Sequence, residues 1–300
     1  MRRLILAMTM LLAGMLTGSA QAQDDWPMLR GDPAGQARTI WPTTLDENAI
    51  RQWRYTSGAS RRFELGLAVW ASPAIADIEG RPTVFIGGYD QTLHALDLLS
   101  KERRWSKLTN APIGSAPAVA VVAGQPVVFF TSSDRTLYAC DAATGQRLWT
   151  RELIAPTATL ERASLSAPFV HEGVVYVTCF AFDRAISRNE QKGELVALDA
   201  VTGRIRFRRD IWPGFLSSPV GITQADGSLR LYVASRRGRL TSFVIRGDVC
   251  ETDWEYQMAH EVFASPVMLT SSDRTRVFLG SKFGQLVCLD ATTGDLLWKA

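Results

Sequence analysis

The side chains that most often carry out catalysis are few in this sequence, and they lie far apart. The three histidines, His94, His171 and His260, are scattered along the chain. His94 alternates with apolar neighbours in a predicted strand, which favours a structural role. The sequence contains neither a Gly-x-Ser-x-Gly nucleophile motif nor a glycine-rich phosphate loop. Neither serine-hydrolase nor phosphate-loop chemistry is therefore indicated.

The four cysteines, Cys140, Cys179, Cys250 and Cys288, form no Cys-x-x-Cys motif and no cluster with histidine. The sequence therefore predicts no metal site. An exported chain can form disulfides. However, Cys140 and Cys288 occupy the same position in two copies of a repeated strand, so they cannot meet. We expect buried free thiols that pack as small apolar side chains.

The most regular pattern in the sequence is an aspartate followed eight positions later by a large aromatic residue. It occurs at Asp97 and Trp105, Asp141 and Trp149, Asp199 and Phe207, and Asp290 and Trp298. The clearest copy, residues 134–149, reads as a strand, a tight turn on Thr144-Gly145 and a second strand ending at Trp149. A unit repeated along the chain indicates a repeat architecture.

Each repeat begins with two small residues and a proline, namely Pro73, Pro117, Pro168, Pro219 and Pro266. The proline is followed by four short strands with turn residues between them. The repeats begin 44 to 51 residues apart, which is close to the period of a propeller blade. The sequence therefore predicts an all-β fold, a β-propeller of four-stranded antiparallel blades.

The predicted propeller spans residues 51–300 and contains five blades plus one additional strand. Gln52–Tyr55 reads as the closing strand of a further blade, since propeller rings often close with an N-terminal strand. We expect residues 1–300 to be a fragment of a ring of about seven or eight blades. The alternative is an open arc, or a ring that a partner completes.

The N-terminus has the features of a signal peptide. Arg2 and Arg3 precede an apolar run, and residues 20–22 read Ala-Gln-Ala, so cleavage is predicted near Ala22. Residues 23–50 form a turn-rich lead-in. The alternative, a membrane anchor, requires roughly 20 apolar residues. We therefore expect a periplasmic or secreted protein with no transmembrane segment after signal removal.

The charge of the mature chain argues against a nucleic-acid partner. Removing residues 1–22 removes two arginines and no acidic residue, so the net charge falls from +3 to +1. A nearly neutral chain lacks the general excess of positive charge that nucleic-acid binding requires.

The repeat resembles that of the pyrroloquinoline quinone (PQQ)-like β-propellers. The pattern Leu-Tyr-Ala-x-Asp-Ala-x-Thr-Gly-x-x-x-Trp is clearest at residues 137–149 and 286–298, and Trp26-Pro-Met-Leu-Arg-Gly-Asp-Pro33 resembles the start of exported members. The resemblance covers roughly residues 26–300. It implies that the aromatic residue docks on the neighbouring blade, the glycine makes a turn and the aspartate supports that turn. The residues with these implied roles are Asp97, Trp105, Asp141, Gly145, Trp149, Asp199, Gly203, Phe207, Trp254, Asp290, Gly294 and Trp298.

The resemblance leaves the function open, because the family includes quinoprotein dehydrogenases, a lipoprotein of outer-membrane assembly and uncharacterised scaffolds. This chain resembles the lipoprotein more, but it lacks the cysteine that a lipoprotein needs at its cleavage site. The dehydrogenases typically carry an adjacent cysteine pair, a calcium site and a catalytic aspartate. The sequence has no such cysteine pair and no metal-ligand pattern.

We therefore predict no catalytic residue, no metal and no cofactor. The expected function is that of a non-catalytic periplasmic scaffold that binds a protein or small ligand. The alternative is a PQQ-dependent oxidoreductase of the alcohol or sugar dehydrogenase type, with PQQ and calcium as cofactors. A third possibility is a propeller that serves a different domain after Ala300.

Blade three departs from the regular spacing in two places. The connection from Trp149 to Pro168 has 19 residues, where three others have 12, and about seven residues are added at 181–192 between its second and third strands. Both segments emerge on the same rim of an up-and-down blade, so we expect them to lie together. Recognition surfaces often form on such loops, although insertions there are also tolerated without a function.

The candidate binding residues on this rim are Arg162, Arg184, Arg188, Lys192 and Trp212. Trp212 reads equally well as a partner contact and as a cap on the core. In the outer strand, simple alternation predicts Arg204, Arg206 and Arg208 on one side and Phe207 on the other. Such a strand either faces solvent and protects the sheet edge or binds an acidic partner.

Overall fold

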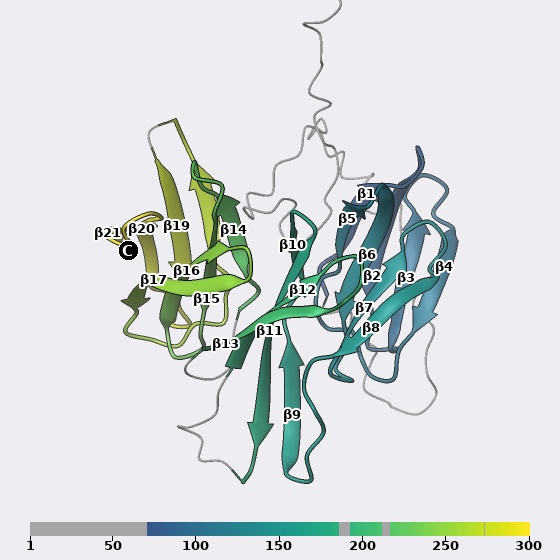
Figure 1. Cartoon of the computed structure of the whole chain (residues 1–300), viewed down its shortest axis with the longest axis horizontal. Helices are drawn as coiled ribbons and strands as arrows, with labels where there is room; N and C mark the ends of the chain where they lie inside the picture. Colours follow the sequence, from purple (N-terminus) through teal and green to yellow (C-terminus); the bar gives the residue numbers. More distant parts are fainter. Residues whose placement is uncertain (1–70, 186–192, 212–216, 273) are drawn as a thin grey trace, which may run out of the picture.

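The computed structural model describes residues 71–185, 193–211, 217–272 and 274–300, and these residues form five antiparallel β-sheets (Figure 1). In four of these sheets the strands pair in sequence order, as in the up-and-down blade of a propeller, and the fifth keeps this order apart from one additional strand. The prediction of an all-β propeller is therefore confirmed. The described residues include no helix long and apolar enough to cross a membrane.

The strands of the first two blades are regular in length and order. Blade one consists of β1 (Ala74–Asp77), β2 (Pro82–Gly87), β3 (Thr92–Asp97) and β4 (Arg103–Leu108). Blade two consists of β5 (Ala118–Val122), β6 (Gln125–Thr131), β7 (Thr136–Asp141) and β8 (Arg147–Glu152).

The other three blades include the one that departs from four strands. Blade three consists of β9 (Leu160–Leu165), β10 (Phe169–His171), β11 (Val174–Asp183), β12 (Gly193–Asp199) and β13 (Ile205–Ile211). Blade four consists of β14 (Val220–Thr223), β15 (Leu229–Ala234), β16 (Arg239–Arg246) and β17 (Val249–Gln257). Blade five consists of β18 (Val267–Thr270), β19 (Thr275–Gly280), β20 (Leu286–Asp290) and β21 (Leu296–Lys299).

The cores lie between neighbouring blades, because each central strand is buried on both faces. In β6, Val128 and Phe130 belong to the core shared with blade one. Val127 and Phe129 point the other way, into the core that continues through blade three. Successive side chains of a strand point to opposite faces, so one apolar run supplies two cores.

A β-bulge precedes the closing aromatic residue in all five sheets. In blade two, Ala139 pairs with Trp149 but the next residue, Cys140, pairs with Arg147, so Leu148 is the extra residue. The pairings of the other four outer strands shift in the same place. A bulge bends its strand and re-aims the following side chain. Here it precedes the tryptophans that reach the neighbouring blade.

Three tryptophans dock on the repeat turn of the following blade. The indole nitrogen Nε1 of Trp105 donates a hydrogen bond to the carbonyl of Ala142 at 3.0 Å. Trp149 donates to Ala200 at 3.0 Å and Trp254 to Ala291 at 3.2 Å. Each ring lies on a turn glycine, which leaves no room for a side chain there. These three glycines are Gly145, Gly203 and Gly294.

The contact between blades three and four is built differently. Phe207 packs in the core near Tyr176, with 6.4 Å between ring centroids, and Gly247 of blade four has no heavy atom near its missing side chain. Instead, Arg206 forms an ion pair with Asp248. Arg208 points to the opposite side, toward blade two. The prediction that Arg206 and Arg208 share one side is therefore wrong, because the bulge at Arg206 interrupts the alternation.

Trp298, the closing aromatic residue of blade five, is 43% exposed. Within the described residues, its ring packs against Phe278 of its own blade. The expected signal peptide at 1–22, the lead-in at 23–50 and the closing strand at Gln52–Tyr55 lie outside the described residues. The blade count of a complete ring therefore stays a prediction.

Candidate functional site

Blade three carries a two-stranded projection, which we call the tongue. It consists of β9 and the end of β11, residues 179–183, paired antiparallel from Leu165 with Cys179 to Leu160 with Asp183. Figure 1 shows the tongue extending below the level of the other blades. Sequence spacing predicted two extended loops beside a four-stranded sheet. The structure corrects this, because part of each extension forms a strand and the sheet has five strands.

Hydrogen bonds close the tip of the tongue. The backbone N–H of Arg184 donates to the carbonyl of Thr159 at 3.1 Å, and Thr157 Oγ1 donates to Asp183 Oδ2 at 3.0 Å. Asp183 Oδ1 accepts the N–H of Ala185 at 2.9 Å. The Thr159 side chain, followed by the Ala185 backbone and the Thr157 side chain, lowers the pKa of Asp183 through hydrogen bonds. Hydrogen bonds therefore close the tip, and the Asp183 carboxylate is ionised at neutral pH beside the Arg184 guanidinium.

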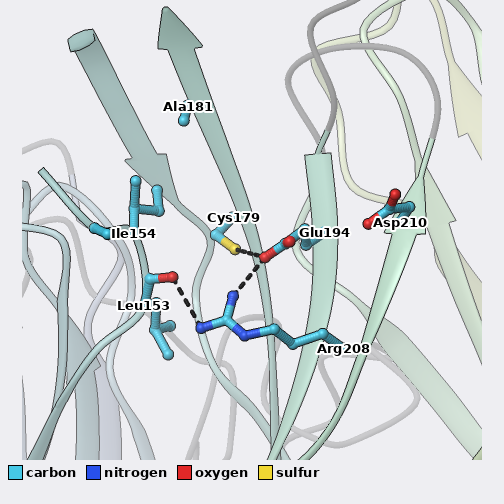
Figure 2. A pocket seen from close by; sticks show the side chains of 8 residues that line it. Leu153, Ile154, Cys179, Ala181, Glu194, Arg208 and Asp210 are labelled. Atoms are coloured by element: carbon cyan, nitrogen blue, oxygen red, sulfur yellow. Dashed lines mark hydrogen bonds and ion pairs between the residues drawn. The ribbon is translucent and has the colours of Figure 1, made fainter. Parts of the chain in front are cut away.

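A cavity of about 380 Å³ lies at the base of the tongue, between blades two and three (Figure 2). Blade two contributes the segment Leu153–Ala155, which directly follows β8. Blade three contributes side chains from three neighbouring strands, namely Cys179, Ala181, Glu194, Arg208 and Asp210. Because Cys179 pairs with Glu194 and Glu194 pairs with Asp210, these three side chains stand in one row across the sheet.

Two charged groups of this cavity, Arg208 and Glu194, satisfy each other. Arg208 donates to Glu194 Oε2 through Nη1 and to the carbonyl of Leu153 at 3.0 Å through Nη2 (Figure 2). The guanidinium therefore links blade three to blade two and neutralises the carboxylate beside it. This arrangement stabilises the base of the tongue rather than presenting a free charge to a substrate.

Cys179 supplies the thiol of the cavity lining, and this thiol is held in its protonated, unreactive form. Its Sγ lies 3.7 Å from Glu194 Oε2 and donates to that carboxylate. Burial, with the nearby Glu194 charge, raises the pKa of the Cys179 thiol to about 12. The thiolate is the reactive form of cysteine. At neutral pH the cavity therefore offers a binding space, not a thiol nucleophile.

The structure describes only part of the predicted binding rim. Arg184 is exposed at the tip of the tongue. Arg162 lies in β9, where its backbone pairs with Phe182, and its side chain is outside the described part. Arg188, Lys192 and Trp212 lie outside the described residues. The shared position of both extensions is thus observed, whereas a binding role for these side chains stays a prediction.

Sequence reasoning missed the cavity. Glu194 occupies the register that Thr136 occupies in blade two, so an acidic side chain there was a detectable departure from the repeat. Its partners could not be foreseen. The link from Arg208 to Leu153 depends on the bulge in β13 and on the closeness of two blades, neither of which the spacing specifies.

The three histidines are separate and occupied by other contacts. His94 Nε2 lies 2.8 Å from Asp90 Oδ2, and both side chains are buried. His171 Nε2 lies 3.0 Å from Thr223 Oγ1, and His260 packs edge-on against Phe283. No group of three or more His, Cys, Asp or Glu side chains that could hold a metal forms among the described residues.

Several solved structures have a similar fold. The quinohemoprotein alcohol dehydrogenase of Comamonas testosteroni matches with a TM-score of 0.65 at 16% identity, over 96% of this chain and 50% of that chain. BamB of Moraxella catarrhalis matches with a TM-score of 0.51 at 18% identity, over 77% and 64%. A europium-containing methanol dehydrogenase matches with a TM-score of 0.65 at 16% identity, over 93% and 58%. This chain thus spans about half to less than two thirds of these relatives, and the likeness shows the fold alone.

The family assignment rests on a match of the sequence to a family model. No curated protein sequence matches the chain significantly. The matching model is described as "Outer membrane protein assembly factor BamB", and the match covers residues 38–180 and 251–300. Together these ranges include more than half of the chain. The chain therefore belongs to the PQQ-like propeller family that this BamB model describes.

Proposed function

We propose that this chain is a non-catalytic, exported propeller scaffold that binds a protein partner through the rim of blade three. The observation that carries the proposal is the tongue, which projects from the rim and has an ordered tip. Binding elements are commonly segments that a rigid scaffold holds away from its body. The predicted signal peptide and the family described by outer-membrane assembly support a periplasmic site of action.

The tongue offers a partner both backbone and side-chain contacts. Within the described residues, β9 pairs with β11 along one edge and with no strand along its other edge. A strand edge of this kind can accept an extended partner segment through backbone hydrogen bonds. Arg184 is exposed at the tip beside Asp183, so the tip presents charges of both signs to a partner.

The cavity chemistry favours binding over catalysis. The raised pKa keeps the Cys179 thiol protonated, and Arg208 and Glu194 pair with each other. Neither arrangement supplies an activated nucleophile or a free general base. The cavity can instead accommodate a small side chain of a partner that has bound the tongue.

Site-specific photo-crosslinking in intact cells tests the proposal. A benzophenone amino acid replaces Ser164 in β9 or Arg184 at the tip, and the matched control replaces Leu99, which is 71% exposed on the opposite rim of blade one. We expect one discrete crosslinked protein from both tongue positions and none from Leu99. Exchanging Arg184, Arg188 and Lys192 together for glutamate should abolish that product. Equal crosslinking from all three positions, or none from the tongue, would contradict the proposal.

A titration with PQQ and calcium distinguishes the scaffold from the alternative function, a PQQ-dependent oxidoreductase. The likeness to two dehydrogenase structures over more than 90% of this chain is what keeps it under consideration. Purified protein is titrated with PQQ and calcium, followed by dye-linked oxidation of primary alcohols. We expect neither tight binding nor dye reduction. Saturable PQQ binding with alcohol-dependent dye reduction would replace the scaffold proposal.

A further inference from the structure

Two phenylalanine rings stand exposed where blades four and five meet. Phe263, in the connection between the blades, is 63% exposed, and Phe283, in the turn between β19 and β20, is 68% exposed. Connections between blades and second-to-third-strand turns emerge on the same rim, so these rings lie on the rim of the tongue. With four neighbours they form what we call the aromatic patch: Arg236, His260, Glu261, Phe263, Lys282 and Phe283.

Cations lie over the faces of both rings. The ammonium nitrogen of Lys282 is 5.9 Å from the ring centroid of Phe263 and 5.4 Å from that of Phe283. The guanidinium of Arg236 lies 5.0 Å from the centroid of Phe263. These are cation–π distances. The patch therefore combines exposed aromatic surface with fixed positive charge, the side-chain types enriched at protein interfaces.

The patch is held in place by the backbone of three turns. The N–H of Val262 donates to the carbonyl of Arg236 at 2.9 Å, and the N–H of Lys282 donates to that of Glu261 at 2.8 Å. The Glu261 carboxylate lies 3.3 Å from Arg236 Nε and 3.5 Å from Lys282 Nζ. A surface that is already ordered loses little conformational entropy when a partner binds.

The charge of the patch selects its partner. Arg236 and Lys282 supply two positive charges, and Glu261 supplies one negative charge between them. The patch is therefore net positive while its exposed ring surface is apolar. Complementary potentials steer association and select partners, so the fitting surface presents carboxylates beside large apolar side chains.

We propose that the aromatic patch docks an extended, acidic protein segment that carries aromatic side chains next to carboxylates. The proposal rests on the proposed function only in expecting a protein partner on this rim. Single-stranded nucleic acid also stacks on aromatic side chains beside cations. However, single-stranded nucleic acid requires a positively charged groove that follows its backbone. This patch offers only two cations, both paired with Glu261, which favours a short acidic peptide.

Fluorescence anisotropy with labelled synthetic peptides tests the docking site on the full chain. One peptide alternates Phe with Asp and Glu, a second has Gly in place of Phe, and a third has Lys in place of the acidic residues. Labelled oligo(dT) is the fourth probe. We expect only the acidic aromatic peptide to bind measurably. The double variant Phe263→Ala, Phe283→Ala should weaken its affinity at least about tenfold.

Two further variants separate docking from a general loss of structure. Lys282→Glu should weaken the acidic peptide and favour the Lys peptide, a reversal that unfolding cannot produce. Leu99→Ala, on the opposite rim, should leave the affinity unchanged. Equal affinity of the double variant and the wild type would overturn the proposal. Tighter binding of oligo(dT), or self-association through the patch without peptide binding, would also overturn it.

The proposed function of the tongue and the proposed docking site on the aromatic patch can be refuted independently. Tongue crosslinking uses variants that do not touch the aromatic patch, and the peptide titration uses variants that leave the tongue intact. Loss of the tongue crosslink with retained peptide binding would remove the proposed function alone. The opposite result would remove only the aromatic patch as a docking site.

Discussion

The indole ring of Trp105 in blade one lies directly on the backbone of Gly145 in blade two. A Cβ atom added to Gly145 would come within 2.7 Å of the ring atom Cδ2. Gly145 also has a φ of +73°, a conformation that costs other residues about 1–2 kcal/mol. This one glycine therefore meets both a backbone requirement and a packing requirement of the contact between blades.

Gly145→Ala should lower the free energy of unfolding by about 2–4 kcal/mol, from the φ penalty and the overpacking against Trp105. Gly124 is a matched control, since its φ is +81° and no heavy atom lies within 4 Å of its missing Cβ. Gly124→Ala should therefore cost only about 1–2 kcal/mol. Urea unfolding followed by tryptophan fluorescence measures both. Equal losses would show that the ring contact contributes nothing.

Acid should weaken the repeat turn of blade three. Asp199 Oδ1 accepts hydrogen bonds from Thr202 Oγ1 at 2.7 Å and Thr202 N at 2.8 Å. These two bonds hold the pKa of Asp199 below its ordinary value of 3.8, and the bond from the Thr202 hydroxyl has the larger effect. Because the folded pKa lies below the unfolded one, the carboxylate stabilises the fold above pH 3.8. That contribution is lost as the pH falls through the folded pKa.

Asp199→Asn retains an acceptor oxygen but cannot titrate. The wild type should therefore be more stable than the variant at pH 7, and the difference should shrink below pH 3.8. Urea unfolding of both proteins at several pH values between 7 and 3 measures the difference. A difference that stays constant over this range would mean that the turn does not depend on the charge of Asp199.

Much of the fold follows from the repeat itself. The spacing from aspartate to aromatic residue defines the last two strands and their turn, and the apolar runs define the buried central strands. These features are predictable because they depend on local turn chemistry and on the period of side chains in a strand. Contacts made inside one repeat and copied to the next are visible in the sequence.

The tongue and its cavity could be predicted only in part. The additional residues of blade three were evident from the spacing, but their pairing into β9 and β11 was not. Ala181 and Ala163 carry no signal that would distinguish an extended strand from a loop. The side on which Arg206 points depends on a bulge, which shifts the alternation by one residue without any motif of its own.

Native Cys179 should resist alkylation. Its pKa of about 12 means that only about one molecule in ten thousand carries the thiolate at pH 8, against roughly a quarter for an unfolded chain. Iodoacetamide should therefore modify Cys179 at least about a hundredfold more slowly in native than in urea-unfolded protein. Peptide mapping by mass spectrometry follows this one residue. Rapid modification of Cys179 in the native protein would show that the cavity contains a reactive thiol.

The ion pair between blades three and four should contribute less to stability than a docked tryptophan. Arg206 and Asp248 are 27% and 54% exposed, and ion pairs in such positions contribute about 0–1 kcal/mol. A double-mutant cycle with Arg206→Gln and Asp248→Asn should therefore give a coupling free energy below about 1 kcal/mol. Removing the indole with Trp149→Ala, between blades two and three, should cost more than about 2 kcal/mol.

Hydrogen exchange would show whether this difference governs local opening. The amides of β13 and β17, which face each other across the contact, should exchange faster than those of β4 and β8, the outer strands of the first two blades. Because β13 also carries Arg208 and Asp210 of the cavity, opening there would loosen the base of the tongue. A coupling free energy above about 2 kcal/mol, or uniform protection across the blades, would place the flexible point elsewhere.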